Sequence, residues 1–157
     1  TPTPTPTPRP TPMPTPTPTP QANALAFGFE AGESNTTWNY SGDTSIKVKP
    51  DNAHGGSNFL KITRNGYAEM RLQLQSISKL IVRTWIWNKA PTGGAYVWIT
   101  TPKGVLKYSI ANSNGYTQFI REVDSAYLVP GLYTIRLGVN TNVDKAAFFD
   151  DVFIYWS

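Results

Sequence analysis

The chain has 157 residues, a net charge of +4 and no cysteine, which excludes a fold held together by disulfides. Its positive charge is small and dispersed, so nothing predicts a nucleic-acid partner. No apolar stretch is long enough to span a bilayer, so we expect no direct membrane insertion. No signal peptide is visible, as expected for a mature or excised fragment.

The first 20 residues alternate threonine and proline, interrupted only at Arg9 and Met13. Proline fixes φ and lacks a backbone donor, so this segment can join neither a helix nor a sheet. In the polyproline II conformation it would reach roughly 60 Å. We expect residues 1–24 to form a Pro-Thr-rich linker and residues 25–157 to form one folded domain of ordinary size.

The rest of the chain alternates apolar and polar residues with a period of two, which is typical of half-buried strands. Turn residues such as Asn65-Gly66 and Pro130-Gly131 separate the alternating segments. The predicted strands are 26–30, 46–49, 59–63, 68–75, 80–88, 95–101, 105–111, 117–123, 133–139 and 148–154. About ten short antiparallel strands at this spacing predict an all-β sandwich of the jelly-roll type.

Residues suited to catalysis are scarce. His54 is the sole histidine, and the sequence holds no nucleophile elbow, zinc-binding helix motif or phosphate-binding loop. A glycosidase would need two carboxylates across the scissile bond, and no pair is marked in the sequence. We therefore predict that the domain is not an enzyme, with a small hydrolase or lyase as the third choice among its possible functions.

Three motifs occur in a set order along the domain. The first is Phe27-Gly28-Phe29-Glu30-Ala31-Gly32 followed by Trp38, the second runs from Ala53 to Ile62, and the third runs from Phe148 to Ile154. The ordered set resembles the calcium-containing β-jelly-roll carbohydrate-binding modules of extracellular glycoside hydrolases and cellulosome-related proteins, of the type that binds xylan or β-glucan. The resemblance covers nearly all of residues 27–155.

The resemblance implies a structural calcium ion where the first and last strands meet. By position, its ligands would be the Gly28 carbonyl, the Glu30 carboxylate, a Ser57 backbone oxygen and Asp150. Calcium prefers such hard oxygen ligands. Asp150 shares the parity of Val152, which points it inward, where a charge needs a partner. The alternative is that Glu30 and Asp150 are solvated acids at strand ends.

Aromatic side chains gather in two consecutive predicted strands, 80–88 and 95–101. If their aliphatic residues face the core, both strands display aromatic rings outward, and we expect these to form one face, Trp85–Trp87–Tyr96–Trp98, beside arginine and amide groups. Sugars bind in this way, with C–H groups on aromatic faces and hydroxyls on planar polar groups. The alternative is that Trp85 and Trp87 belong to the core. The predicted binding residues are Arg71, Gln73, Arg83, Trp85, Trp87, Tyr96, Trp98, Arg136 and Asn140.

These features favour a secreted or cell-surface bacterial module, monomeric, that binds a plant cell-wall type of polysaccharide. The linker would join it to a catalytic or anchoring module on its N-terminal side, where tethering raises the effective concentration of the partner at the substrate. The alternative is a protein-interaction or glycan-sensing ectodomain on a stalk.

Overall fold

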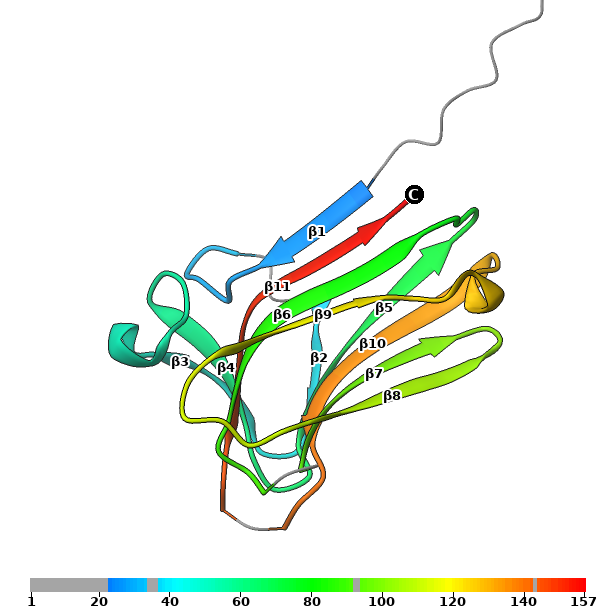
Figure 1. Cartoon of the computed structure of the whole chain (residues 1–157). Coiled ribbons are helices and arrows are strands. Elements are labelled where there is room, and N and C mark those ends of the chain that lie inside the picture. Colours follow the sequence, from blue (N-terminus) through cyan, green and yellow to red (C-terminus); the bar gives the residue numbers. More distant parts are fainter. Residues whose placement is uncertain (1–22, 34–36, 92–93, 143) are drawn as a thin grey trace, which may run out of the picture.

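Eleven strands build two antiparallel sheets in the part of the chain that the computed structural model describes, residues 23–33, 37–91, 94–142 and 144–157 (Figure 1). The two sheets pack face to face around one core, so the predicted all-β sandwich of the jelly-roll type is confirmed. Residues 1–22 of the predicted linker lie outside the described residues. Among the residues described, no helix is long and apolar enough to cross a membrane.

The six-stranded sheet, here called sheet A, carries both ends of the domain. Its path is β3-β4-β11-β6-β9, and β1 pairs with the C-terminal half of β11 (Figure 1). The strands of sheet A are β1 (Asn23–Phe27), β3 (Thr44–Val48), β4 (Asn58–Ile62), β6 (Leu80–Asn88), β9 (Thr117–Glu122) and β11 (Ala147–Trp156).

The five-stranded sheet, sheet B, follows the order β2-β5-β10-β7-β8. Its strands are β2 (Asn39–Ser41), β5 (Tyr67–Leu74), β7 (Ala95–Thr101), β8 (Gly104–Ile110) and β10 (Gly131–Val139). Two short 3-10 turns, Pro50–Asn52 and Ser125–Tyr127, lie in loops.

The core forms from the inward residues of both sheets, which alternate with outward residues along each strand. From sheet A it includes Val82 and Ile86, and from sheet B it includes Val97, Ile135 and Leu137, all fully buried. Since both sheets turn their apolar residues to this common core, their outer faces point in opposite directions.

Strand bounds agree with the predicted ones most closely in the centre of the domain and least closely at its start. β6 and β7 have the bounds predicted for them, whereas β1 begins at Asn23 and ends at Phe27, before the predicted motif reaches Glu30. The residues after β1 cannot continue the strand because Phe29 has a φ of 60°. The short strand β2 was not predicted.

Candidate functional site

A row of polar and aromatic side chains crosses the outer face of sheet B. The strand registers place Glu69 beside Arg136, Arg136 beside Trp98 and Trp98 beside Lys107. At the edge of the sheet, Asn39 pairs with Glu69. Directly opposed residues point to the same side of a sheet, so these five strands bring one residue each to a common line.

Glu69 anchors this row as a nearly buried carboxylate, with 6% of its side chain exposed. Its Oε1 accepts hydrogen bonds from Arg71, with Nε at 3.0 Å, and its Oε2 accepts from Arg136, with Nε at 2.9 Å. Burial alone would raise the pKa of Glu69, but the hydrogen bonds and charges of the two guanidinium groups outweigh it and lower that pKa. The same carboxylate raises the pKa of Arg136 against the opposing effect of burial. The carboxylate therefore fixes two cations on the outer surface.

Two stacked rings lie next to this network. The rings of Tyr96 and Trp98 are 4.3 Å apart and inclined by 28°. Tyr96 lies flat over Gly138, where a Cβ would be only 2.4 Å from its Cζ and Oη atoms. Burial in this position raises the pKa of Tyr96. Because Tyr96 is only 6% exposed, it supports Trp98 from below and offers little surface of its own.

Trp98 is the half-buried ring on top of this stack, and cations flank it. Lys107 Nζ lies 4.8 Å from the ring centroid, and the Arg136 guanidinium lies 5.9 Å from Trp98 and 4.2 Å from the ring of Tyr67. A ring stacked on a second ring, with charged donors over it, can stack on a sugar ring once the mobile lysine side chain moves aside, and the donors can hydrogen-bond the substituents of the sugar. This face of sheet B is the candidate functional site.

The structure brings most of the predicted binding residues together on sheet B. Arg71 and Gln73 are exposed on β5, in alternation with the buried Met70 and Leu74. Asn140 directly follows β10, and its backbone N–H donates to the Gly94 carbonyl. The members of the predicted set on this sheet are Arg71, Gln73, Tyr96, Trp98, Arg136 and Asn140.

The expectation that Trp85 and Trp87 share one face with Tyr96 and Trp98 is wrong. β6 belongs to sheet A and β7 to sheet B, so the chain crosses from one sheet to the other between them. Trp85, Trp87 and Arg83 do point outward, in alternation with buried residues of β6, but on the opposite side of the sandwich.

Trp85 and Trp87 are also covered by other parts of the chain. The His54 ring stacks on Trp85 at 3.9 Å, with an interplanar angle of 15°. Lys89 Nζ lies 3.8 Å above the Trp87 ring, and the ring of Tyr116 meets Trp87 edge-on. The stack of His54 on Trp85 attaches the loop around residue 54 to sheet A and gives His54 a packing role.

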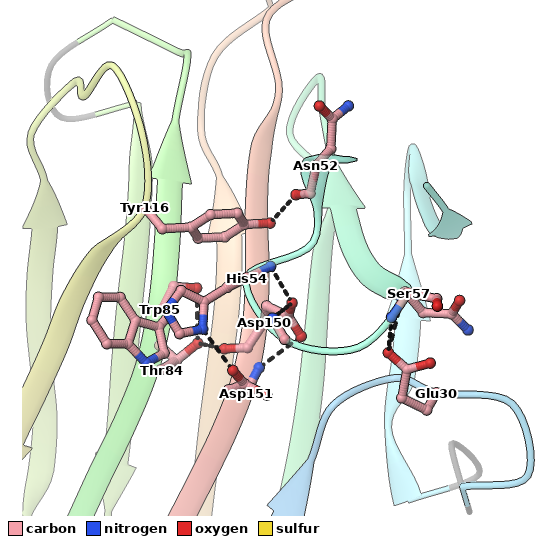
Figure 2. A network of polar contacts seen from close by, with 11 residues as sticks. Glu30, Asn52, His54, Ser57, Thr84, Trp85, Tyr116, Asp150 and Asp151 are labelled. Carbon is pink, nitrogen blue, oxygen red and sulfur yellow. Dashed lines mark hydrogen bonds and ion pairs between the residues drawn. The ribbon is translucent and has the colours of Figure 1, made fainter. Parts of the chain in front are cut away.

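The residues of the predicted calcium site lie along the same loop (Figure 2). At one end of the loop, Glu30 Oε1 accepts the backbone N–H groups of Ser57 and Asn58 at 2.7 and 2.9 Å. At the other end, Asp150 Oδ2 accepts those of His54 and Gly55 at 2.8 and 3.1 Å. Through these hydrogen bonds the two carboxylates hold both ends of the loop, residues 54–58, against the rest of the domain.

Asp150 is fully buried, as predicted, but the expected reason is wrong. The register of β11 against β6 shifts between Asp150 and Phe153, and Asp151 has a φ of 45°, as in a β-bulge. Asp150 therefore shares the outward side of Trp85, its cross-strand partner, whereas Val152 enters the core. The loop covers Asp150 from outside.

In this arrangement the two carboxylates predicted to bind calcium, Glu30 and Asp150, accept backbone N–H groups. Asp150 directs Oδ2 at two backbone N–H groups and Oδ1 at the N–H of Asp151, 2.8 Å away. Burial raises the pKa of Asp150 to about 6, with these N–H groups acting in the opposite direction. In the described part of the chain, no three His, Cys, Asp or Glu side chains gather in a way that could hold a metal ion. Calcium remains a prediction from the family resemblance.

A cavity of about 370 Å³ opens beside this loop on sheet A. Its charged lining includes Glu30, Glu33, Asp151 and Arg83, and Trp85 also lines it. Glu33 Oε2 accepts the Gly28 N–H at 2.9 Å, and Asp151 pairs with the His54 ring at 2.7 Å. Glu30 and Asp151 thus bind the loop, whereas Glu33 binds the segment after β1.

The sequence-based prediction missed four residues of the sheet B site, among them Asn39 on the unpredicted strand β2. Tyr67 and Glu69 alternate with the inward residues of β5 as Arg71 does. The same alternation that predicted an outward Arg71 could therefore have predicted these two residues. Lys107 carried no signal by itself, because only the pairing of β7 with β8 places it beside Trp98.

No known family and no curated protein matches the sequence. Solved structures do match the fold. A family 61 carbohydrate-binding module in complex with β-1,4-galactotriose is 17% identical, with a TM-score of 0.60, over 83% of this chain and 94% of that chain. A family 35 carbohydrate-binding module from Clostridium thermocellum is 13% identical, with a TM-score of 0.56, over 84% and 97%.

The K2 cleaved adhesin domain of Lys-gingipain is similar as well, at 12% identity and a TM-score of 0.58, over 86% of this chain and 99% of that chain. The domain therefore has the β-sandwich fold found in carbohydrate-binding modules. Identities this low establish the fold alone, and the same architecture also serves an adhesin.

Proposed function

We propose that the protein is a non-catalytic, secreted module that binds polysaccharide through the outer face of sheet B. The observation that carries the proposal is the Trp98 ring, held from below by Tyr96 and flanked by Arg136 and Lys107. An aromatic platform with fixed hydrogen-bond donors matches the two surfaces of a sugar, its C–H face and its polar rim.

The fold and the sequence support the same proposal. The first solved structure described above is a module bound to a galactose oligosaccharide, and the Thr-Pro segment suits a tether to a catalytic or anchoring module. The family resemblance makes plant cell-wall polysaccharides, such as xylan and β-glucan, the first ligands to test. Tethering would hold an attached enzyme near its substrate without any chemistry in this domain.

Affinity electrophoresis tests the proposal directly. The full chain is run in gels that contain xylan, β-glucan, galactan or pectin, and its mobility is compared with that of a non-binding protein of similar size. We expect retardation in at least one gel and no release of reducing sugar from that polysaccharide. Unchanged mobility in every gel would contradict glycan binding, and release of sugar would contradict a non-catalytic role.

A further inference from the structure

Charge is unevenly distributed over the outer face of sheet B. The strands of this sheet, all within the described residues, contain the three cations Arg71, Lys107 and Arg136 against the single carboxylate Glu69, a net charge of +2. The strands of sheet A hold four cations and three carboxylates, a net charge of +1, so the two sheets differ mainly in where their cations lie: Lys47, Lys61, Arg83 and Arg121 against Glu122, Asp150 and Asp151. The cations of sheet B thus gather around its aromatic platform.

The positions of these cations determine how much positive charge a ligand on sheet B would meet. Glu69 lies beneath them, almost buried, and satisfies one side of each guanidinium. The Arg71 side chain is 63% exposed and that of Arg136 is 31% exposed, so both retain surface toward solvent. One buried anion therefore orients two arginines and neutralises only one of the two positive charges.

Lys107 occupies space that a neutral sugar would need. Its Nζ lies 4.8 Å from the centroid of Trp98, and a sugar stacked on this ring must either displace the ammonium group or pair with it. Displacement forfeits the cation–π contact. A sugar with an acidic substituent can pair with the displaced ammonium group, and this ion pair replaces the lost cation–π contact.

From this charge distribution we infer that the ligand is an anionic polysaccharide. One sugar ring would stack on Trp98 with its acidic group, a uronate carboxylate or a sulfate ester, between Arg136 and Lys107, and Arg71 on β5 would meet the acidic group of a neighbouring sugar of the chain. Guanidinium groups bind both kinds of anion with paired hydrogen bonds. This inference rests on the proposed function, since it assigns the ligand class of the same face.

The test compares glycans that differ in charge. Dissociation constants are measured by affinity electrophoresis for polygalacturonate, for the same polymer fully methyl-esterified, for a sulfated galactan and for the unsulfated galactan, at 50 and 200 mM NaCl. We expect the acidic polymers to bind at least about tenfold more tightly than their neutral counterparts, with the difference shrinking at high salt. The carboxylated and sulfated polymers show which acidic group is preferred.

Matched variants separate this site from general attraction between a basic protein and a polyanion. Arg71→Gln and Lys107→Gln should each weaken acidic-glycan binding about fivefold, the effect of losing an exposed charge contact. Arg83→Gln removes an exposed arginine from the opposite sheet. This variant should change the dissociation constant for the acidic glycan by less than about twofold. Poly-glutamate, an acidic polymer without sugar rings, should not retard the protein to the same extent.

The possible results are distinct. Equal binding of esterified and free polygalacturonate, or equal effects of Arg71→Gln and Arg83→Gln, would overturn the anionic ligand and leave glycan binding intact. Equal retardation by poly-glutamate would also overturn it. If no glycan of either charge binds, the proposed function itself fails.

Discussion

Gly138 allows a direct test of how the aromatic stack is held on sheet B. A Cβ at this position would lie 2.4 Å from Cζ and Oη of Tyr96 and 2.9 Å from Cε1, so Gly138→Ala forces the ring away. The backbone at Gly138 is not in the left-handed region, so space alone opposes a side chain. Overpacking of this kind costs about 1–3 kcal/mol, partly offset by the lower flexibility of alanine, about 0.5–1 kcal/mol.

We therefore expect Gly138→Ala to lower the free energy of unfolding by about 1–2 kcal/mol, or the melting temperature by roughly 3–8 °C for a domain of this size. Trp98 stacks on Tyr96, so the same variant should also weaken polysaccharide binding. Thermal unfolding followed by tryptophan fluorescence, with affinity electrophoresis, measures both effects.

Two further variants serve as controls. Gly115→Ala adds a Cβ with no atom within 4 Å and should leave stability and binding unchanged. In a Tyr96→Val background the obstructing ring is gone, so Gly138→Ala should cost nothing there, which a double-mutant cycle detects. An unchanged melting temperature and unchanged binding in Gly138→Ala would refute the packing of Tyr96 on Gly138.

The other predictions concern the two carboxylate networks. Glu69→Gln should destabilise the domain by about 1–2 kcal/mol at pH 7, because it removes charge-assisted hydrogen bonds from two arginines that remain partly exposed to solvent. The folded state lowers the pKa of Glu69, so its contribution is complete above the unfolded value of about 4.3 and is lost as the pH falls through the folded value. The stability gap between wild type and Glu69→Gln in urea melts should accordingly narrow from pH 7 to pH 3, and a constant gap would contradict this. EDTA tests the predicted calcium ion: we expect it to lower the melting temperature, because an ion bound only by the folded state stabilises that state, and an unchanged melting temperature would contradict the ion.

Sequence patterns predicted the fold well because alternation reports directly on burial. The period of two in β5, β6 and β10 identified which side chains face the core, and the structure keeps that assignment in each strand. Alternation does not report which sheet a strand joins. The assignment of Trp85 and Trp98 to one face failed for this reason, since consecutive strands in a jelly roll can cross between sheets.

Local irregularities of the strands also limited what could be predicted from the sequence. The bulge in β11 reverses the parity between Asp150 and Val152, and nothing in the alternation of this apolar strand signals it. The burial of Asp150 depends on a loop about 95 residues earlier in the chain. Likewise, Lys107 joins the site only through the pairing of two strands. Such features depend on tertiary contacts and cannot be inferred from the period of a single strand.

The comparison of Trp98→Ala with Trp85→Ala tests the central claim most directly, because the two rings lie on opposite faces of the sandwich. Isothermal titration calorimetry with a polysaccharide that retards the wild type would measure the affinity of each variant. We expect Trp98→Ala to lose about thirtyfold or more, the effect of truncating a dominant aromatic contact, and Trp85→Ala to bind as the wild type does. Full binding by Trp98→Ala, with loss of binding in a folded Trp85→Ala, would place the site on sheet A and contradict the account.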